Sequence, residues 1–182
     1  MQETIQQKTE PLRKAIGSSI VRWAPPQNIH LTLKFLGDVS ATSVEILTQM
    51  LRSQADSHSA FDIHISGLGS FPSLKRPRVL FIGIQAPAEL ETLYRGIESE
   101  TTRLGYESDN HGFSPHLTLG RVKQNSSTDD QQKIRKALEE TKVDSLGTAR
   151  VDSVHLYKSD LKPSGSVYTK LFSAPLRSVV TI

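Results

Sequence analysis

The chain has 182 residues, 36% of them apolar and 23% charged, which fits a globular protein rather than a disordered one. It contains no cysteine, which excludes disulfide bonds, thiol nucleophiles and cysteine-ligated zinc. The net charge of +3 and the pI near 9.2 are mildly basic, which favours a polyanionic ligand without proving one.

No stretch of the sequence approaches the roughly 18 to 20 apolar residues that span a membrane. The N-terminal sequence MQETIQQKTEPLRK lacks the apolar segment and the cleavage site of a secretory signal. We therefore predict a cytoplasmic protein that does not contact a membrane, and we expect it to be a monomer.

The first third of the chain predicts a helix over residues 1–16 that Pro11 would kink or restart. It also predicts a strand over 20–26 that ends in two prolines. Residues 28–37, NIHLTLKFLG, alternate strictly between apolar and polar side chains. This alternation predicts a strand. One face would carry Ile29, Leu31, Leu33 and Phe35, and the other His30, Thr32 and Lys34.

The middle of the chain predicts a capped helix within residues 38–58 and an alternating strand over 61–69. A proline-rich connection, 70–77, leads to a buried strand at 78–84. Residues 86–105, with a proline near the start and a glycine at the end, predict another helix.

The last third predicts a strand within residues 112–122, a polar helix over 127–140, and strands over 149–160 and 166–176. The tight connection between the last two strands favours antiparallel pairing. Together with the helices it predicts an α+β fold. Because one strand motif occurs in each half, we expect two similar lobes that face each other across a cleft.

The repeated motif is His-Leu-Thr-Leu, at residues 30–33 and again at 116–119. On a strand, residues two positions apart project from the same face. Each copy would therefore present an imidazole and a hydroxyl while its leucines anchor the other face. The alternative is structural, since threonine favours strands for steric reasons and a single strand histidine is commonly inert. Two matched copies favour the functional interpretation.

Two imidazoles suit the hydrolysis of a phosphodiester, in which the attacking water loses a proton while the leaving oxygen gains one. Histidine can act as acid or base near neutral pH. The hydroxyls of Thr32 and Thr118 could donate hydrogen bonds to phosphate oxygens. Such a site would need no metal, and the sequence contains no HExxH motif.

Arg121, two residues after the second motif, could bind phosphate through its guanidinium. Strict alternation would turn it toward the leucine face as a structural ion-pair partner, unless a bulge at Gly120 redirects it. Lys34 shares the His30 face and could simply be solvated. His58, His64 and His155 fit structural roles better. His111 lies shortly before the second motif and could line the cleft, although a structural role is favoured for it as well.

Longer segments around both motifs resemble a known family. WAPPQNIHLTLKFLG, FSPHLTLGRV and VHLYKSDLKPSGSVYTKL are similar to the two-histidine (2H) phosphoesterase superfamily, in its RNA 2′,3′-cyclic phosphodiesterase branch, also called LigT-like or 2′-5′ RNA ligase. The resemblance runs from about Val21 to the C-terminus. It implies one bilobal, pseudo-two-fold α+β domain over residues 1–182, in which two antiparallel sheets line a central, positively charged cleft and the helices lie outside.

The resemblance also implies the reaction, a metal-independent and cofactor-free opening of an RNA 2′,3′-cyclic phosphate end to a 2′-phosphate. By position, His30 would protonate the departing 3′ oxygen, and His116 would activate water. Thr32 and Thr118 would hold phosphate oxygens, with Arg121 near the substrate. Phe113 could stack a base or belong to the core.

The sequence departs from the family at its start. Relatives usually begin with a short apolar strand ahead of the first helix, whereas this sequence starts with MQETIQQ. We expect either a start codon assigned too late or a sheet edge left uncovered, which would lower stability or promote pairing between molecules.

Two other functions stay open at this point. The same acid and base could act on cyclic nucleotides or on 2′-5′ linkages, including ligation in reverse. The protein could also bind RNA ends without turnover, although binding alone would not need two titratable imidazoles.

Overall fold

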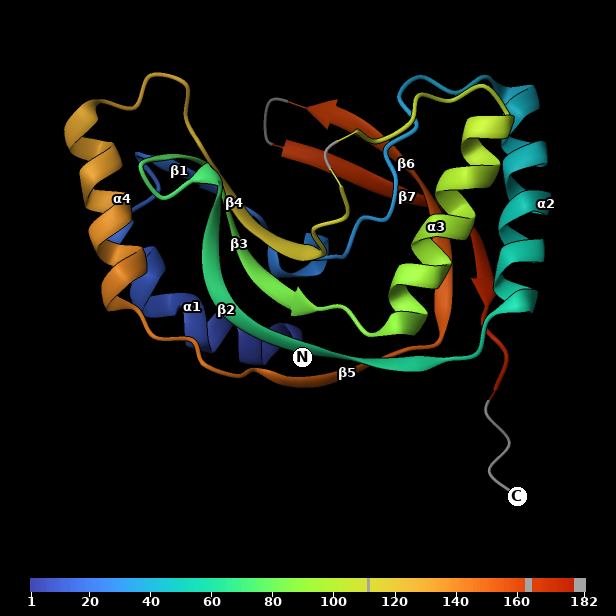
Figure 1. Cartoon of the computed structure of the whole chain (residues 1–182). Coiled ribbons are helices and arrows are strands. Elements are labelled where there is room, and N and C mark those ends of the chain that lie inside the picture. Colours follow the sequence, from blue (N-terminus) through green and yellow to red (C-terminus); the bar gives the residue numbers. More distant parts are fainter. Residues whose placement is uncertain (111, 163–164, 179–182) are drawn as a thin grey trace. The chain divides into compact units, whose positions relative to one another are not determined.

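The computed structural model describes residues 1–110, 112–162 and 165–178 (Figure 1). By their contacts these residues form two compact units, each assembled from three chain segments. Unit 1 comprises Met1–Thr32, His64–Gln85 and Pro115–Ala149. Unit 2 comprises Leu33–Ile63, Ala86–Ser114 and Arg150–Ile182.

Unit 1 holds most of a five-stranded sheet in the order β1-β4-β3-β2-β5, in which β1, β4, β3 and β2 pair antiparallel. Its strands are β1 (Val21–Trp23), β2 (Phe61–Ser73), β3 (Arg76–Gln85), β4 (His116–Val122) and β5 (Gly147–Val151). The helices of this unit are α1 (Gln2–Ile16), the short 3₁₀ helix η1 (Pro26–Asn28) and α4 (Thr128–Glu140).

One face of this sheet packs against α1 and α4, and we call it the helix face. Alternate residues of β3 and β4, among them Leu80, Ile82 and Leu119, are fully buried there. The helices contribute buried residues at helical spacing, Ile5, Leu12 and Ile16 from α1 and Ile134, Ala137 and Leu138 from α4. Burying each large aliphatic side chain contributes about 1.5–3 kcal/mol to folding, so this face anchors the sheet.

Unit 2 pairs two helices with a two-stranded antiparallel sheet. Helix α2 (Ala41–Ser57) contacts α3 (Ala88–Arg103) and the hairpin formed by β6 (Ser153–Lys162) and β7 (Gly165–Pro175). The side chain of Ser40 caps α2 by accepting a hydrogen bond from the backbone N–H of Ser43. Leu47 and Leu51 of α2, with Leu90, Leu93 and Ile97 of α3, form the buried face.

The predicted helices are confirmed within a few residues at each end, but the strand predicted over 28–37 is wrong. Only Leu31 makes a β-bridge in this segment, and the η1 turn precedes it. Phe35, expected on a core face, is 77% exposed. The alternation stops because the segment has no continuous partner strand beyond Leu31 to hold it extended.

The proline-rich connection predicted over 70–77 is also wrong, because β2 and β3 run through it as a hairpin. Pro72 and Pro77 lie opposite each other, next to a shift in register. Prolines are tolerated at such irregular positions, where a strand does not need every backbone N–H.

The expectation of two similar lobes, based on one motif in each half of the sequence, stays a prediction. Both copies of His-Leu-Thr belong to unit 1, the first in Met1–Thr32 and the second in Pro115–Ala149.

Among the described residues, no helix is long and apolar enough to span a bilayer.

Gly120 of β4 lies in close contact with β1. A Cβ atom at Gly120 would lie 2.7 Å from Val21 Cγ1 and 3.0 Å from the Arg22 carbonyl oxygen. The Gly120→Ala variant should therefore lose about 1–3 kcal/mol of unfolding free energy, measured by urea titration.

Gly96→Ala in α3 is the matched control, because an added Cβ there would meet only the movable end of the Gln54 side chain. A helical Gly→Ala change can gain about 1 kcal/mol, so this variant should stay close to wild type or exceed it. Equal urea midpoints for the two variants would contradict the tight packing at Gly120.

Candidate functional site

The two motifs meet at one β-bridge inside unit 1. Leu31 and Leu117 are antiparallel partners, and Leu117 is buried on the helix face. One step along each chain, His30 lies level with Thr118, and Thr32 with His116. Because neighbours of an inward residue on an extended chain point outward, all four side chains project from the face opposite the helices.

The register of β4 with β3 locates the second motif independently. Gly83 lies opposite His116, Phe81 opposite Thr118, and both β3 residues are half-buried between fully or nearly fully buried neighbours. Cross-strand partners share a sheet face. We call the face that carries His116 and Thr118 the motif face.

Arg121 also lies on the motif face, because the register shifts by one residue between β3 and β4. Gly120 pairs with Leu80, but Thr118 pairs with Phe81, so Leu119 is an extra residue on β4. Such a bulge changes which side the following residues face. Arg121 is exposed opposite Val79 instead of turning into the helix face.

Arg22 of β1 is a cation that the sequence analysis missed. It is exposed and lies directly opposite Arg121 across the β1–β4 pair. The signal was present in the strand at 20–26, where buried Val21 precedes the outward-facing Arg22.

Typical sheet spacing gives the motifs a geometry suited to one small anion. Side chains directly opposite each other have Cβ atoms about 4.5–5.5 Å apart, and diagonal neighbours about 7–8 Å. His30 and His116 stand in the diagonal relation, with Thr118 level with His30. Two imidazoles can thus flank a group held by the threonine hydroxyls.

The His30 ring is oriented by the backbone just before it. Its Nδ1 lies 2.7 Å from the carbonyl oxygen of Asn28. A carbonyl can only accept, so Nδ1 carries the proton, and Nε2 holds the lone pair in the neutral ring. The η1 turn that ends at Asn28 therefore sets the tautomer of the first histidine.

The His116 ring lies against two phenylalanines of the motif face. Its centroid is 4.9 Å from that of Phe71, in an edge contact, and 5.3 Å from that of Phe81. These two rings stack on each other at 4.3 Å. Phe81 in turn covers Gly69, where a Cβ would lie 2.5 Å from its ring. The sequence analysis had interpreted this strand only as buried.

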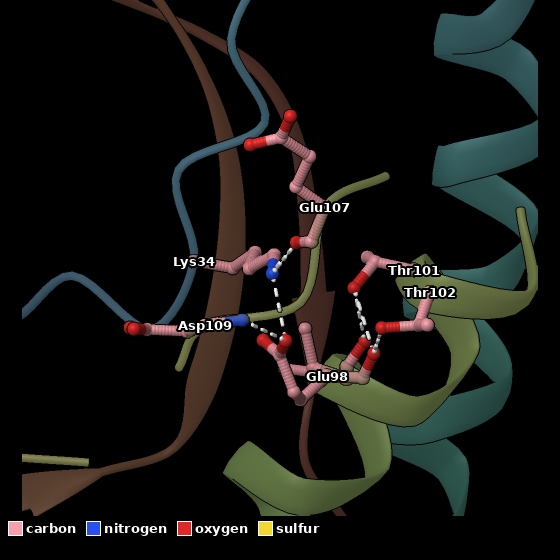
Figure 2. Close-up of polar contacts among 7 residues, drawn as sticks. Lys34, Glu98, Thr101, Thr102, Glu107 and Asp109 are labelled. Atoms are coloured by element: carbon pink, nitrogen blue, oxygen red, sulfur yellow. Dashed lines mark hydrogen bonds and ion pairs between the residues drawn. The ribbon is translucent and has the colours of Figure 1, made fainter. Parts of the chain in front are cut away.

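Lys34, directly after the first motif, is buried rather than solvated as the sequence suggested. Its Nζ forms an ion pair with Glu98 at 2.8 Å, and the two side chains are only 8% and 14% exposed. Figure 2 shows that Lys34 also donates to the Glu107 carbonyl, while the Asp109 N–H donates to Glu98 at 2.7 Å. Within unit 2 this cluster joins α3 to the segments on either side of it in sequence.

Hydrogen bonding decides the charge of Glu98. Burial by itself would raise the pKa of this carboxyl, but the hydrogen bonds from Lys34 and Asp109 and the Lys34 charge outweigh it. The pKa of Glu98 therefore lies below its ordinary value, and Glu98 is ionised at neutral pH.

Phe113, considered as a base-stacking surface, is stacked on Tyr94 inside unit 2. Their ring centroids are 4.0 Å apart and the planes differ by 9°. Phe113 is therefore a half-buried core residue that packs against α3.

The other described histidines make local contacts. His58 Nδ1 donates to the Gln54 carbonyl at 2.7 Å at the end of α2, and His64 Nε2 lies 3.2 Å from the Ser145 hydroxyl. Burial, and next the Lys170 charge, lower the pKa of His155. His111 lies outside the described residues. Within the described ranges, no three His, Asp or Glu side chains gather in a metal-ligating group.

Comparison with known proteins connects this arrangement to a family. The model of the 2′-5′ RNA ligase superfamily matches residues 2–163. The chain belongs to this superfamily. A relative from Methanothermobacter thermautotrophicus, named RNA 2′,3′-cyclic phosphodiesterase, is 32% identical over 151 residues, which cover 83% of this chain and 80% of the relative.

Solved structures confirm the α+β, LigT-like fold predicted from the sequence. A Thermus thermophilus protein is 26% identical with a TM-score of 0.76, covering 98% of this chain and 91% of that one. E. coli LigT complexed with phosphate is 26% identical with a TM-score of 0.68, covering 97% and 92%.

The Lys34–Glu98 pair should stabilise the protein in a pH-dependent way. Glu98→Gln should cost about 1.5–3 kcal/mol of unfolding free energy at neutral pH, because it removes charge-assisted hydrogen bonds. A carboxyl with a lowered folded pKa contributes fully above its unfolded pKa, and this contribution is lost as pH falls through the folded value.

Urea titrations of both proteins at neutral pH and below pH ~4 measure this difference. The gap between wild type and Glu98→Gln should shrink in acid. Glu91→Gln is the control, because its pair with Arg95 is exposed on the same helix and should contribute little at either pH. A Glu98→Gln gap that stayed constant or widened in acid would contradict this account.

Proposed function

We propose that this protein is an RNA 2′,3′-cyclic phosphodiesterase that opens the cyclic phosphate at an RNA end to a 2′-phosphate. The observation that carries the proposal is the Leu31–Leu117 bridge, which brings both His-Leu-Thr motifs to one face of one sheet. The name of the 32%-identical relative supports the same activity.

Thr32, Thr118 and Arg121 would hold the cyclic phosphate. The hydroxyls donate hydrogen bonds to its non-bridging oxygens, and the Arg121 guanidinium, turned outward by the bulge, offsets its charge. Both kinds of donor stabilise the additional negative charge that develops on those oxygens as water attacks.

His116 would act as base and His30 as acid. His116 takes a proton from the attacking water while the new P–O bond forms, and the bond between phosphorus and the 3′ oxygen breaks. His30, protonated on both nitrogens at that moment, gives its Nε2 proton to the departing 3′ oxygen. The Asn28 carbonyl accepts from Nδ1, which leaves Nε2 as the nitrogen that transfers the proton. The products are a 2′-phosphate and a free 3′ hydroxyl, and no metal takes part.

A second activity, formation or cleavage of 2′-5′ linkages, is favoured by the superfamily to which the chain belongs. In ligation the 5′ hydroxyl of a second RNA replaces water, so His116 takes its proton and His30 still protonates the departing 3′ oxygen. In cleavage of the 2′-5′ linkage the roles exchange, because His30 takes the proton of the attacking 3′ hydroxyl and His116 protonates the departing 5′ oxygen. The same motif face would serve both reactions.

Hydrolysis of a short RNA with a 2′,3′-cyclic phosphate end, in the presence of EDTA, tests the proposal. His30→Ala and His116→Ala should each lower kcat/KM by about 10²-fold or more, because each removes one proton-transfer group. The only product should be a 2′-phosphate. It is identified by treatment with phosphatases that remove either a 2′- or a 3′-phosphate.

His58→Ala is the matched control, since this histidine caps α2 in unit 2 and should leave kcat/KM unchanged. Tight binding of the RNA end without turnover in the wild type would replace the enzyme with an RNA-end binding module. Loss of activity in EDTA that a divalent metal restores would contradict the metal-free mechanism.

A further inference from the structure

The strands around the motifs have a strong charge bias. Residues 17–32, 64–85 and 115–128 contain no aspartate or glutamate, although the whole chain has 19 acidic residues against 22 basic ones. The same three segments carry six lysines and arginines. These segments supply β1, β3, β4 and most of β2. In these four strands the only carboxylate is Asp62 at the start of β2, and it pairs with Arg150 at 3.4 Å.

The cations of β1, β4 and the β2–β3 hairpin lie toward one end of the sheet. His116 and Thr118 of the second motif lie opposite Gly83 and Phe81 of β3. Arg121 lies opposite Val79, which is two residues nearer the β2–β3 hairpin. The hairpin sequence that follows is basic and exposed, with Lys75, Arg76 and Arg78. At strand spacing, Arg76 is about 17 Å along β3 from the residue opposite Thr118. In the other direction, residues 79–85 and 64–71 carry no lysine or arginine.

These cations are not neutralised by carboxylates in the part of the chain that the structure describes. Within the described residues, no ion pair is formed by Arg22, by Arg121 or by the three hairpin cations. Arg22 and Arg121 even lie directly opposite each other, a placement of like charges that weakens a sheet. By contrast, on α4 the basic cluster KIRK is partly neutralised, because Arg135 pairs with Glu139 at 2.8 Å and Lys136 with Glu140 at 3.8 Å.

We propose that Arg22, Arg121 and the hairpin residues Lys75, Arg76 and Arg78 form a binding track for the phosphate backbone of a single RNA strand. The cyclic end lies at the motifs, and the nucleotides on its 5′ side pass over the arginine pair to the hairpin. The inference rests on the proposed function, and it adds that the preferred substrate is a polynucleotide rather than a mononucleotide.

The physical reason is the density of negative charge on RNA. Cations that contact phosphates release bound counterions, and for single strands each contact adds about 0.7 to the slope of log affinity against log salt. Two arginines that lie opposite each other without a carboxylate partner destabilise the ligand-free protein. A phosphate between the two guanidiniums would offset their repulsion. Sequence would not be read, because only the backbone is contacted.

The test compares two sets of three alanine substitutions that each remove three positive charges. One set removes the hairpin cations, Lys75→Ala, Arg76→Ala and Arg78→Ala. The matched set, on the exposed side of α4 in the same unit, is Lys133→Ala, Arg135→Ala and Lys136→Ala. Kinetics with a 2′,3′-cyclic mononucleotide and with a cyclic-ended RNA oligonucleotide, and anisotropy titrations of a 2′-phosphate-ended RNA over a range of salt, provide the readouts.

For the hairpin variant we expect KM on the oligonucleotide to rise about 10- to 100-fold and the salt slope of RNA binding to fall by about 2. Its kcat/KM on the mononucleotide should equal that of the wild type, which also shows that it folds. The α4 variant should match the wild type in every measurement. Equal loss on both substrates, no loss on either, or equal loss in the α4 variant would overturn the track.

Failure of the proposed function gives a different result. If the wild type turns over neither substrate, the phosphodiesterase assignment fails, but the anisotropy titrations still decide the track. RNA bound weakly by the hairpin variant and tightly by the wild type and the α4 variant would support it. RNA bound equally by all three, or by none, would overturn it.

Discussion

The pairing of Leu31 with Leu117 determines where both motifs point. Each leucine is the middle residue of a His-Leu-Thr triplet, and burying Leu117 on the helix face fixes its neighbours on the other side of the sheet. Since the side-chain period of an extended chain is two residues, a shift of one residue would bury the histidines instead. The hydrophobic packing of α1 and α4 therefore holds the imidazoles and hydroxyls in place, although no helix residue needs to touch the substrate.

A local irregularity extends this arrangement. Because of the bulge at Leu119, buried residues lie both before and after it in sequence and Arg121 still faces outward. Gly120 leaves room for β1 to approach. The same approach brings Arg22 beside Arg121. One extra residue thus converts an alternating strand into a surface with two imidazoles, two hydroxyls and two guanidiniums, a combination suited to a phosphate ester and to the chain attached to it.

The periodic parts of this structure could be predicted from the sequence, because amphipathic helices and alternating strands record their own burial. The α+β class and the four helices follow from these patterns, whereas the meeting of the two motifs depends on the pairing of Leu31 with Leu117. Features that depend on a partner far away in sequence could not be predicted in this way. Lys34 turns inward because Glu98 is there to pair with it, Phe35 is exposed because its segment has no partner strand, and Arg121 faces outward because β3 and β4 change register.

The claim that both motifs act on one phosphate is tested most directly by NMR of the histidine rings. The chain has six histidines, so ¹⁵N-labelled imidazoles give a spectrum simple enough to assign by substitution. During titration with a nucleoside 2′-phosphate, the resonances of His30 and His116 should shift together with a single dissociation constant, while those of His58 and His155 stay in place. A shift of only one of the two motif histidines, or different dissociation constants for them, would contradict a shared site.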